Sequence, residues 1–291
     1  MVIIRELYRQ KQPVFSLEVF PPQKETDSDV EALYGTLAQI AKLSPGFISV
    51  TCGAGGIGGK SKTVGVADYI QKQHGVLSLA HLTCATATRL EVENALAEMR
   101  LCGVSNVLAL RGDITADEQP AALAEYRYAA ELIDDLRGRE KDLCIGAACY
   151  PEGHIECDDL GADMTHLLRK QEAGADFLIT QLFFENDIFY RFRESAGAAG
   201  ITLPISAGVM PILSRAQIQR MIFLCGASLP SRIIKLLHKY EHHPHDLRAA
   251  GIEYAAEQVR ELAGQGAAGV HIYTMNRPEI AEACASALGQ S

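Results

Sequence analysis

The chain has 291 residues, of which 48% are hydrophobic and 22% charged, with a formal net charge of -9. These proportions are typical of a compact protein with a substantial core, and the length admits one large domain or two medium ones. The acidic balance argues against nucleic acid as a partner, because nucleic-acid binding normally requires a basic face. No apolar run reaches the roughly 20 residues needed to cross a bilayer, and the N-terminus does not resemble a signal peptide.

The cysteines indicate the redox setting. Eight of them are distributed along the chain without any CxxC pair. Most lie in apolar stretches, where a free cysteine behaves as a small buried hydrophobic residue. Because metal-ligand spacing is missing, we expect no metal site. Reduced thiols predict a cytoplasmic protein without disulfides.

Short apolar runs rich in β-forming residues recur along the chain. They lie at 16–20, 47–51, 77–82, 106–111, 144–150, 177–182, 204–209 and 269–275. Near-continuous apolar strands of this kind are typical of a parallel sheet that is covered on both faces. Stretches with helical periodicity lie between several of them, at 30–43, 89–103, 121–138 and 163–175. We expect helix C-caps at the glycines that follow or end such stretches, namely Gly75, Gly103, Gly138 and Gly174.

Eight strands that alternate with helices predict a (β/α)8 barrel, for which this chain length is typical. The longer interval 209–269 predicts two or more extra helices before the eighth strand, and we expect 1–291 to be one domain. An open doubly wound sheet is the competing fold, but no GxGxxG follows the first strand. The glycine-rich stretch 53–59 contains that spacing after the second strand. The next helix is expected to begin only near Thr63, so a glycine-rich βα loop is favoured over a dinucleotide cradle.

In a barrel, the chemistry lies at the C-terminal ends of the strands. Polar residues occur at or just beyond these ends in seven of the expected strands: Glu18, Thr51, His81, Thr83, Arg111, Asp113, Tyr150, His154, Gln181, Tyr273, Asn276 and Arg277. Gly112 separates Arg111 from Asp113 at the end of the fourth strand. Glu18 and Asp113 are the strongest candidates, because carboxylates flanked by apolar strand residues are rarely structural. The apolar surroundings of Glu18 favour the protonated form of its carboxyl.

Two other patterns have ordinary explanations. Arg169 and Lys170 fit either a solvated helix face or a phosphate clamp. A second pattern places His238 and His242 at i,i+4 spacing, which suits a zinc pair, but no acid completes an HExxH motif. We therefore favour surface histidines for the whole cluster, which comprises His238, His242, His243 and His245.

Several motifs now combine into a family pattern. SLEVFPP, FISVTCGAGG, AHLTC, LALRGD, ACYPEGH, FLITQLFFEN, AGVMPI and IYTMNR occur in this order over nearly the whole chain. Together they resemble the 5,10-methylenetetrahydrofolate reductase family, in particular its short bacterial form, which is the catalytic barrel alone. The resemblance implies FAD as the prosthetic group. It also implies a ping-pong reduction of 5,10-methylenetetrahydrofolate to 5-methyltetrahydrofolate by NADH or NADPH, without deciding between the two, in a dimer or tetramer of identical subunits.

The resemblance also implies roles for individual residues. Glu18 matches the catalytic acid, and Asp113 matches an aspartate near the flavin and the folate pterin. The residues that match FAD-binding positions are Thr51, His81, Arg111, Gly112, Asp113, Tyr128, Ala129, Tyr150, His154, Asp163, Arg169 and Lys170. Those that match substrate-binding positions are Gln181, Gln217, Met221 and Arg277. The chain departs from the family pattern at Cys52, where relatives commonly have Tyr, at His166, where an Asn is frequent, and at Met221, in place of a Phe.

Other functions remain open at this level. A folate-dependent methyltransferase on the same barrel, without flavin, would need a Cys/His zinc site or a cobalamin partner. A class I aldolase would need a lysine at a strand end, and the expected strands contain none. A non-catalytic binding barrel would not be expected to place two carboxylates in its mouth.

Overall fold

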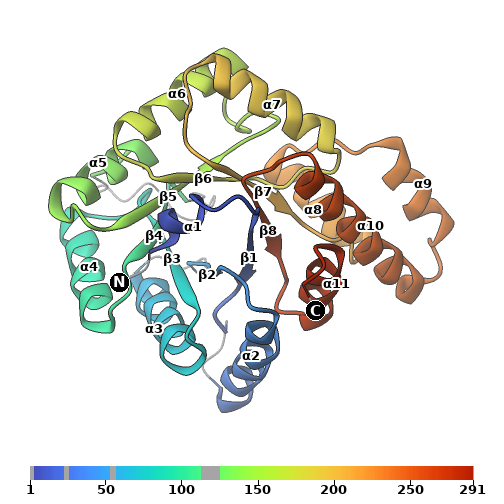
Figure 1. Cartoon of the computed structure of the whole chain (residues 1–291), viewed down its shortest axis with the longest axis horizontal. Helices are drawn as coiled ribbons and strands as arrows, with labels where there is room; N and C mark the ends of the chain where they lie inside the picture. The colour runs from blue at the N-terminus through green and yellow to red at the C-terminus, as the bar shows by residue number, and fades with distance from the viewer. Residues whose placement is uncertain (1–2, 23–25, 53–56, 113–124, 291) are drawn as a thin grey trace.

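The computed structural model describes residues 3–22, 26–52, 57–112 and 125–290, with residues 57–61 described in their backbone only. Within these ranges the strands form a closed parallel barrel in chain order (Figure 1). The strands are β1 Val14–Val19, β2 Phe47–Val50, β3 Leu77–Thr83, β4 Asn106–Leu110, β5 Cys144–Cys149, β6 Phe177–Thr180, β7 Ile205–Val209 and β8 Gly269–Tyr273. Each expected strand is therefore confirmed, and the (β/α)8 barrel with it.

The helices form a ring around this barrel (Figure 1). They are α2 Asp27–Ile40, α3 Ile57–His74, α4 Arg89–Cys102, α5 Ala129–Arg139, α6 Leu160–Glu172, α7 Asn186–Ala198, α8 Arg215–Cys225, α9 Ser231–Lys239, α10 Pro244–Gly264 and α11 Pro278–Ala287, with a 3-10 turn η1 at Ala41–Leu43. None of the helices in the described ranges is long and apolar enough to span a membrane.

The strands are buried on both faces because they separate two packed layers. In β1, Phe15, Leu17 and Val19 join the large cluster that packs the barrel against its helices. The alternate residues face the interior, where Val14 and Phe47 begin an apolar layer at the lower end of the barrel. This period of two explains why the strands read as continuous apolar runs, since each face meets its own core.

A short helix closes the lower, N-terminal end of the barrel. This helix is α1, Ile4–Leu7, and it lies across the barrel centre in Figure 1. The Ile4 amide donates to Asn106 Oδ1 at 2.9 Å, and the hydroxyls of Tyr8 and Ser206 are 2.7 Å apart. Because this end is plugged, a ligand reaches the interior from the C-terminal ends of the strands.

Three expected helix boundaries are wrong. Helix α3 begins at Ile57 rather than near Thr63, whose hydroxyl instead bonds the Thr51 carbonyl at 2.9 Å. Helix α5 begins at Ala129, although residues 125–128 are expected to be helical; the expected start at 121 lies outside the described residues. The Glu131 carboxylate accepts the backbone amides of Arg127 and Tyr128 and fixes the start at Ala129. Gly138 lies inside α5, which continues to Arg139.

The other three expected C-cap glycines lie at or just after helix ends with positive φ. Gly75 and Gly103 follow α3 and α4 with φ of +65° and +69°, and Gly174 has φ of +107° one residue after the C-cap of α6. A residue without Cβ adopts these values at little cost, which explains glycine at these positions.

The long interval before β8 contains α8, α9 and α10, as the spacing predicts. In Figure 1, α9 lies outside the ring, beside α10. Residues of these helices, including Ile218 and Ile233, pack with Leu182, Phe184 and Met210 in a second apolar cluster. This cluster extends the barrel wall upward on the side of β6, β7 and β8.

Candidate active site

A buried carboxyl group lies inside the barrel, near the upper ends of the strands. Glu18 is only 7% exposed and pairs in register with Ser49 of β2 and Tyr273 of β8. Its Oε2 lies 3.5 Å from Nε2 of His81 and 3.5 Å from Nε2 of His271. The Ser49 hydroxyl donates to the same oxygen at 3.4 Å. An acid, two imidazoles and a hydroxyl therefore meet at one point.

Burial of His81 favours the neutral form of its imidazole. Burial lowers the pKa of His81 to about 4, and the charge of Glu18 offsets only part of that effect. His81 is therefore neutral at physiological pH, so the short Glu18–His81 distance is not an ion pair. Among the described residues, His81 Nε2 also has no hydrogen-bond partner. A buried polar atom without a hydrogen-bond partner destabilises the fold, and such atoms often mark functional sites.

The neighbouring residues hold this group in place. His271 is fully buried and its Nδ1 lies 2.8 Å from the Ser16 hydroxyl. Above it, the side chain of Asn276 bonds both the amide and the carbonyl of Phe20, at 2.8 and 2.9 Å. The amide clamp fixes the chain that leaves β1 directly after Glu18.

The predicted substrate residues lie on the other side of the barrel mouth and have local partners. Gln181 follows β6 and its Oε1 accepts the Leu182 amide at 2.8 Å. Gln217 lies in the first turn of α8, where its side chain accepts the Leu213 amide at 2.7 Å and donates to the Pro211 carbonyl at 3.2 Å.

The remaining two predicted substrate residues lie on α8 and at the start of α11. Met221 packs against the second apolar cluster. Arg277 is the N-cap residue of α11, with its guanidinium 3.7 Å from Glu279.

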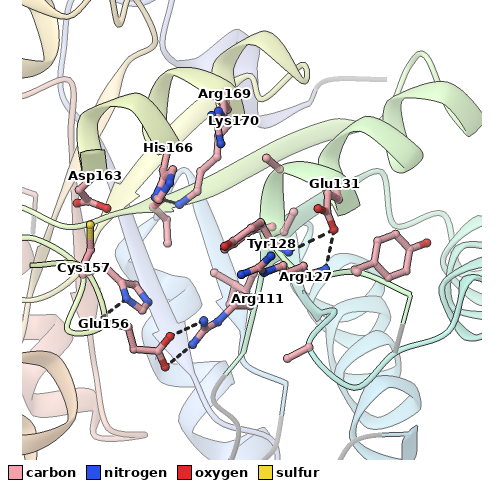
Figure 2. A pocket seen from close by; sticks show the side chains of 18 of the residues that line it. Arg111, Arg127, Tyr128, Glu131, Glu156, Cys157, Asp163, His166, Arg169 and Lys170 are labelled. Carbon is pink, nitrogen blue, oxygen red and sulfur yellow. Dashed lines mark hydrogen bonds and ion pairs between the residues drawn. The ribbon is translucent and has the colours of Figure 1, made fainter. Parts of the chain in front are cut away.

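A cavity of about 750 Å³ opens at the upper ends of β4 and β5, between α5 and α6 (Figure 2). Ligand pockets commonly measure about 300–1,000 Å³, so this one accommodates a large cofactor. Eight of the twelve predicted FAD-binding residues line it: Arg111, Tyr128, Ala129, Tyr150, His154, Asp163, Arg169 and Lys170. These residues come from four separate segments, and the fold brings them together.

Cations and acids share the walls of this cavity. Arg111 makes a bidentate ion pair with Glu156, at 2.6 and 2.7 Å (Figure 2). Lys170 donates to the Ala148 carbonyl at 2.8 Å and lies 5.3 Å from the ring centroid of Tyr150. Burial lowers the pKa of the Lys170 ammonium, and the negative charge of nearby Asp163 offsets part of this decrease.

Flat rings and small side chains supply the rest of the surface. The rings of Tyr128 and His166 stack with centroids 5.9 Å apart. Tyr150 and His154 pack edge to face at 4.7 Å. Alanines line the remaining wall, and they leave room for a broad planar group: Ala85, Ala109, Ala129, Ala130 and Ala148.

Among the described residues, Thr51, His81 and Gly112 are predicted to bind FAD but do not line the cavity. Thr51 directly follows β2, and His81 lies on β3. Gly112 follows β4 with φ of +87°. A Cβ on Gly112 would lie 3.0 Å from the Cβ of Thr83, so both backbone angle and space require glycine there. Asp113, the second predicted catalytic residue, lies outside the described residues.

The sequence reasoning missed several residues of the cavity. Glu156 and Cys157 lie in the loop after β5, and Arg127 precedes α5, with its guanidinium 5.1 Å from the ring centroid of Tyr128. Their position after a strand end or before a helix start was the available signal. The histidine cluster, in contrast, is exposed at all four positions, His238, His242, His243 and His245, as expected.

A closed (β/α)8 barrel with a buried acid in its mouth and a cofactor-sized cavity beside it defines a TIM-barrel enzyme. The chain belongs to the methylenetetrahydrofolate reductase family, whose model matches residues 3–289. It is 32% identical over 280 residues to 5,10-methylenetetrahydrofolate reductase of Salmonella typhimurium, with 96% of this chain and 92% of that protein covered.

Longer relatives match over the same region. Methylenetetrahydrofolate reductase (NADH) 1 of Arabidopsis thaliana is 33% identical over 285 residues, and the match covers 94% of this chain. The chain spans about half the length of such relatives, 48% in this case. Among solved structures, an uncharacterised Clostridium thermocellum protein that binds two copies of 5-methyl-5,6,7,8-tetrahydrofolic acid superposes with a TM-score of 0.70. That match covers 98% of this chain and 96% of the other at 14% identity, and it supports the fold.

Proposed function

We propose that this protein uses bound FAD and NADH or NADPH to reduce 5,10-methylenetetrahydrofolate to 5-methyltetrahydrofolate. The observation that carries the proposal is the pairing of a cofactor-sized cavity with a buried acid in one barrel mouth. Family membership over residues 3–289 supports the same reaction. We also propose that 1–291 acts as one catalytic unit and assembles as a homo-oligomer.

The cavity residues suit the parts of FAD. Arg169, Lys170 and the N-terminal end of α5 would hold the pyrophosphate, because cations and a helix N-terminus both favour phosphate. Asp163 would accept a ribose hydroxyl, and the alanine-lined wall would receive the flat flavin ring. Arg111 would join them by exchanging its Glu156 partner for the cofactor. When bound, FAD supplies the hydride transfer that no amino-acid side chain provides.

The remaining predicted FAD residues have narrower roles. Tyr128 and Ala129 begin α5, and the exposed tyrosine ring offers a stacking surface. Tyr150 and His154 form the adjoining wall beneath Lys170. Thr51, His81 and Gly112 would approach the flavin from the β2, β3 and β4 side of the mouth.

Glu18 is the proposed general acid. Opening the five-membered ring of the folate requires a proton on the leaving N10, and Glu18 carries a carboxyl in a site closed to bulk water. Neutral His81 places no positive charge beside the Glu18 carboxyl. The Ser49 hydroxyl and the Asn276 clamp would orient the acid toward the mouth.

Asp113 is proposed to remain ionised and to stabilise the cationic folate electrostatically. Gln181, Met221 and Arg277 would contact the substrates from β6, α8 and α11. Gln217 would join them only after its amide leaves the Leu213 and Pro211 backbone groups.

The proposal is tested in two half-reactions. Protein reconstituted with FAD should lose its flavin colour anaerobically when NADH or NADPH is added, and 5,10-methylenetetrahydrofolate should restore it. A colourless protein that binds no FAD but transfers a methyl group from folate would instead identify a folate-dependent methyltransferase.

A further inference from the structure

Three potential metal ligands meet on one wall of the cavity. The Sγ of Cys157, a carboxylate oxygen of Asp163 and a ring nitrogen of His166 all lie within 4.8 Å of one another. Figure 2 shows the sulfur of Cys157 next to the carboxylate of Asp163, with the ring of His166 beside it. Within the described residues, this is the one group of three potential metal ligands whose atoms lie this close together.

Local structure produces this arrangement. Asp163 and His166 are three residues apart on α6, so their side chains lie on the same face of the helix. Cys157 lies in the preceding loop, where its amide donates to the His154 carbonyl at 2.8 Å. The loop then turns into the helix at Asp159, whose side chain caps it by accepting the Gly161 amide. A ten-residue stretch thus supplies all three ligands, with a C-x5-D-x2-H spacing unlike that of common zinc motifs.

The surroundings support a cation at this point. The Asp163 side chain is 8% exposed and accepts a hydrogen bond from the backbone amide of His154, which orients the carboxylate. Such outer contacts are typical of metal ligands. Residues 156–163 also carry four acids, Glu156, Asp158, Asp159 and Asp163. The opposing positive charges include Arg111, which pairs with Glu156, and Lys170, which lies near Asp163.

We propose that Cys157, Asp163 and His166 bind a divalent cation of the Zn²⁺ class, with water in the fourth position. A thiolate, an imidazole and a carboxylate together suit Zn²⁺ and exclude Mg²⁺ or Ca²⁺, which prefer oxygen ligands. Ligand atoms in a tetrahedral zinc site are about 3.3–3.7 Å apart, so closing the triangle requires side-chain shifts of about 1 Å. On binding, the thiol releases its proton to solvent and gives up its hydrogen bond to the Asp159 carbonyl.

The position of this site has a consequence for the flavin. All three ligands line the cavity proposed to hold FAD, and Asp163 is itself a proposed FAD ligand. Binding of the metal and binding of FAD therefore exclude each other. This second part rests on the proposed function, whereas metal coordination by the apoprotein does not.

Cobalt(II) is the probe for coordination, because a thiolate ligand gives an intense near-ultraviolet charge-transfer band that histidine and carboxylate alone do not. Titration of the FAD-free full chain should develop this band to one equivalent, and Zn²⁺ should abolish it. Cys157→Ala should lose the band, and His166→Asn should weaken cobalt affinity by about tenfold or more. Cys102→Ala and His238→Asn, which alter a thiol and an exposed histidine on other helices, should behave as wild type.

Absence of the band in folded wild-type protein, or its persistence in Cys157→Ala, would overturn the site. Competition is measured separately, by titrating FAD with and without Zn²⁺. The apparent Kd for FAD should rise in proportion to free Zn²⁺ in wild type, and the ratio of the two Kd values should fall to about one in Cys157→Ala. An FAD affinity unaffected by saturating Zn²⁺ would overturn competition. Failure to bind FAD without any metal would overturn the proposed function and leave the cobalt result to decide the metal site.

Discussion

Glu18 Oε2 lies 3.5 Å from Nε2 of His271, a residue with no exposed surface. The strand register explains the relationship, because Ser16 pairs with His271 and Glu18 pairs with Tyr273 across β1 and β8. The imidazole therefore lies one layer below the carboxyl, and the Ser16 hydroxyl on the neighbouring strand lies 2.8 Å from its Nδ1. The acid of the proposed reaction stands on a rigid, buried support rather than on a loop.

The first prediction concerns the acid itself. Glu18→Gln keeps the shape of the side chain and removes its proton-donating group. Reduction of bound FAD by NADH or NADPH should continue near the wild-type rate, whereas folate reduction should fall by about 10²–10⁴-fold, the usual contribution of a general acid. Anaerobic stopped-flow measurement of each half-reaction separates the two. Equal loss in both would show that Glu18 does not act as the folate acid.

The second prediction concerns the hydroxyl that holds Glu18. Ser49→Ala removes the donor 3.4 Å from Glu18 Oε2 and should slow the folate half-reaction roughly two- to fivefold, or about 0.5–1 kcal/mol. Ser78→Ala is the matched control, because Ser78 is equally buried and its hydroxyl has no partner among the described residues. That variant should leave both half-reactions unchanged. Equal effects from the two substitutions would contradict a role for Ser49 in positioning the acid.

The third prediction concerns cofactor retention. Arg169 lines the cavity, and Arg169→Ala should weaken FAD binding about 10- to 100-fold if the guanidinium meets a phosphate, since hydrogen bonds to charged groups contribute about 1.5–3 kcal/mol. The loss should be smaller at high salt, where the wild-type contact is screened. Fluorescence titration of FAD into apoprotein measures both effects. Arg191→Ala, at an exposed position on α7, serves as the control and should bind FAD normally.

The fourth prediction concerns pH and stability. Because burial lowers the pKa of His81 from 6.5 to about 4, the unfolded chain takes up this proton before the folded chain as the pH falls. The resulting stability is complete above pH 6.5 and is lost as the pH falls toward 4, by about 3 kcal/mol in total.

Replacing His81 removes this loss. His81→Gln should therefore reduce the difference in unfolding free energy between about pH 7 and about pH 5 by about 2 kcal/mol. Urea unfolding of wild type and variant at both pH values measures it. His238→Gln, at an exposed position, should keep the wild-type pH dependence. An unchanged dependence in His81→Gln would mean that His81 does not lose its proton on folding.

Much of the fold follows from the sequence because parallel strands have a strong local signature. Each run such as 47–51 or 177–182 is buried on both faces and appears as a strand close to its expected bounds. Helix starts were harder, since they depend on contacts outside the periodic pattern. Helix α5 begins at Ala129 because Glu131 captures two preceding amides, and hydrophobic spacing carries no information about that contact.

Some residues of the site could be predicted from the sequence, whereas others could be found only from the fold. Glu18 was accessible to sequence reasoning because an acid in an apolar strand is conspicuous. The cavity could not be predicted without the fold, which brings Arg111, directly after β4, to Glu156 in the loop after β5. The grouping of Cys157 with Asp163 and His166 also escaped, because its spacing matches no familiar metal motif and only the turn into α6 brings the three together.

The most direct test of the proposed reaction is an anaerobic double titration of the FAD-loaded full chain. The flavin absorbance should be bleached by NADH or NADPH and then restored stoichiometrically by 5,10-methylenetetrahydrofolate, with 5-methyltetrahydrofolate as the product. A flavin that the nicotinamide reduces but the folate does not reoxidise, or a chain that takes up no FAD, would contradict the account.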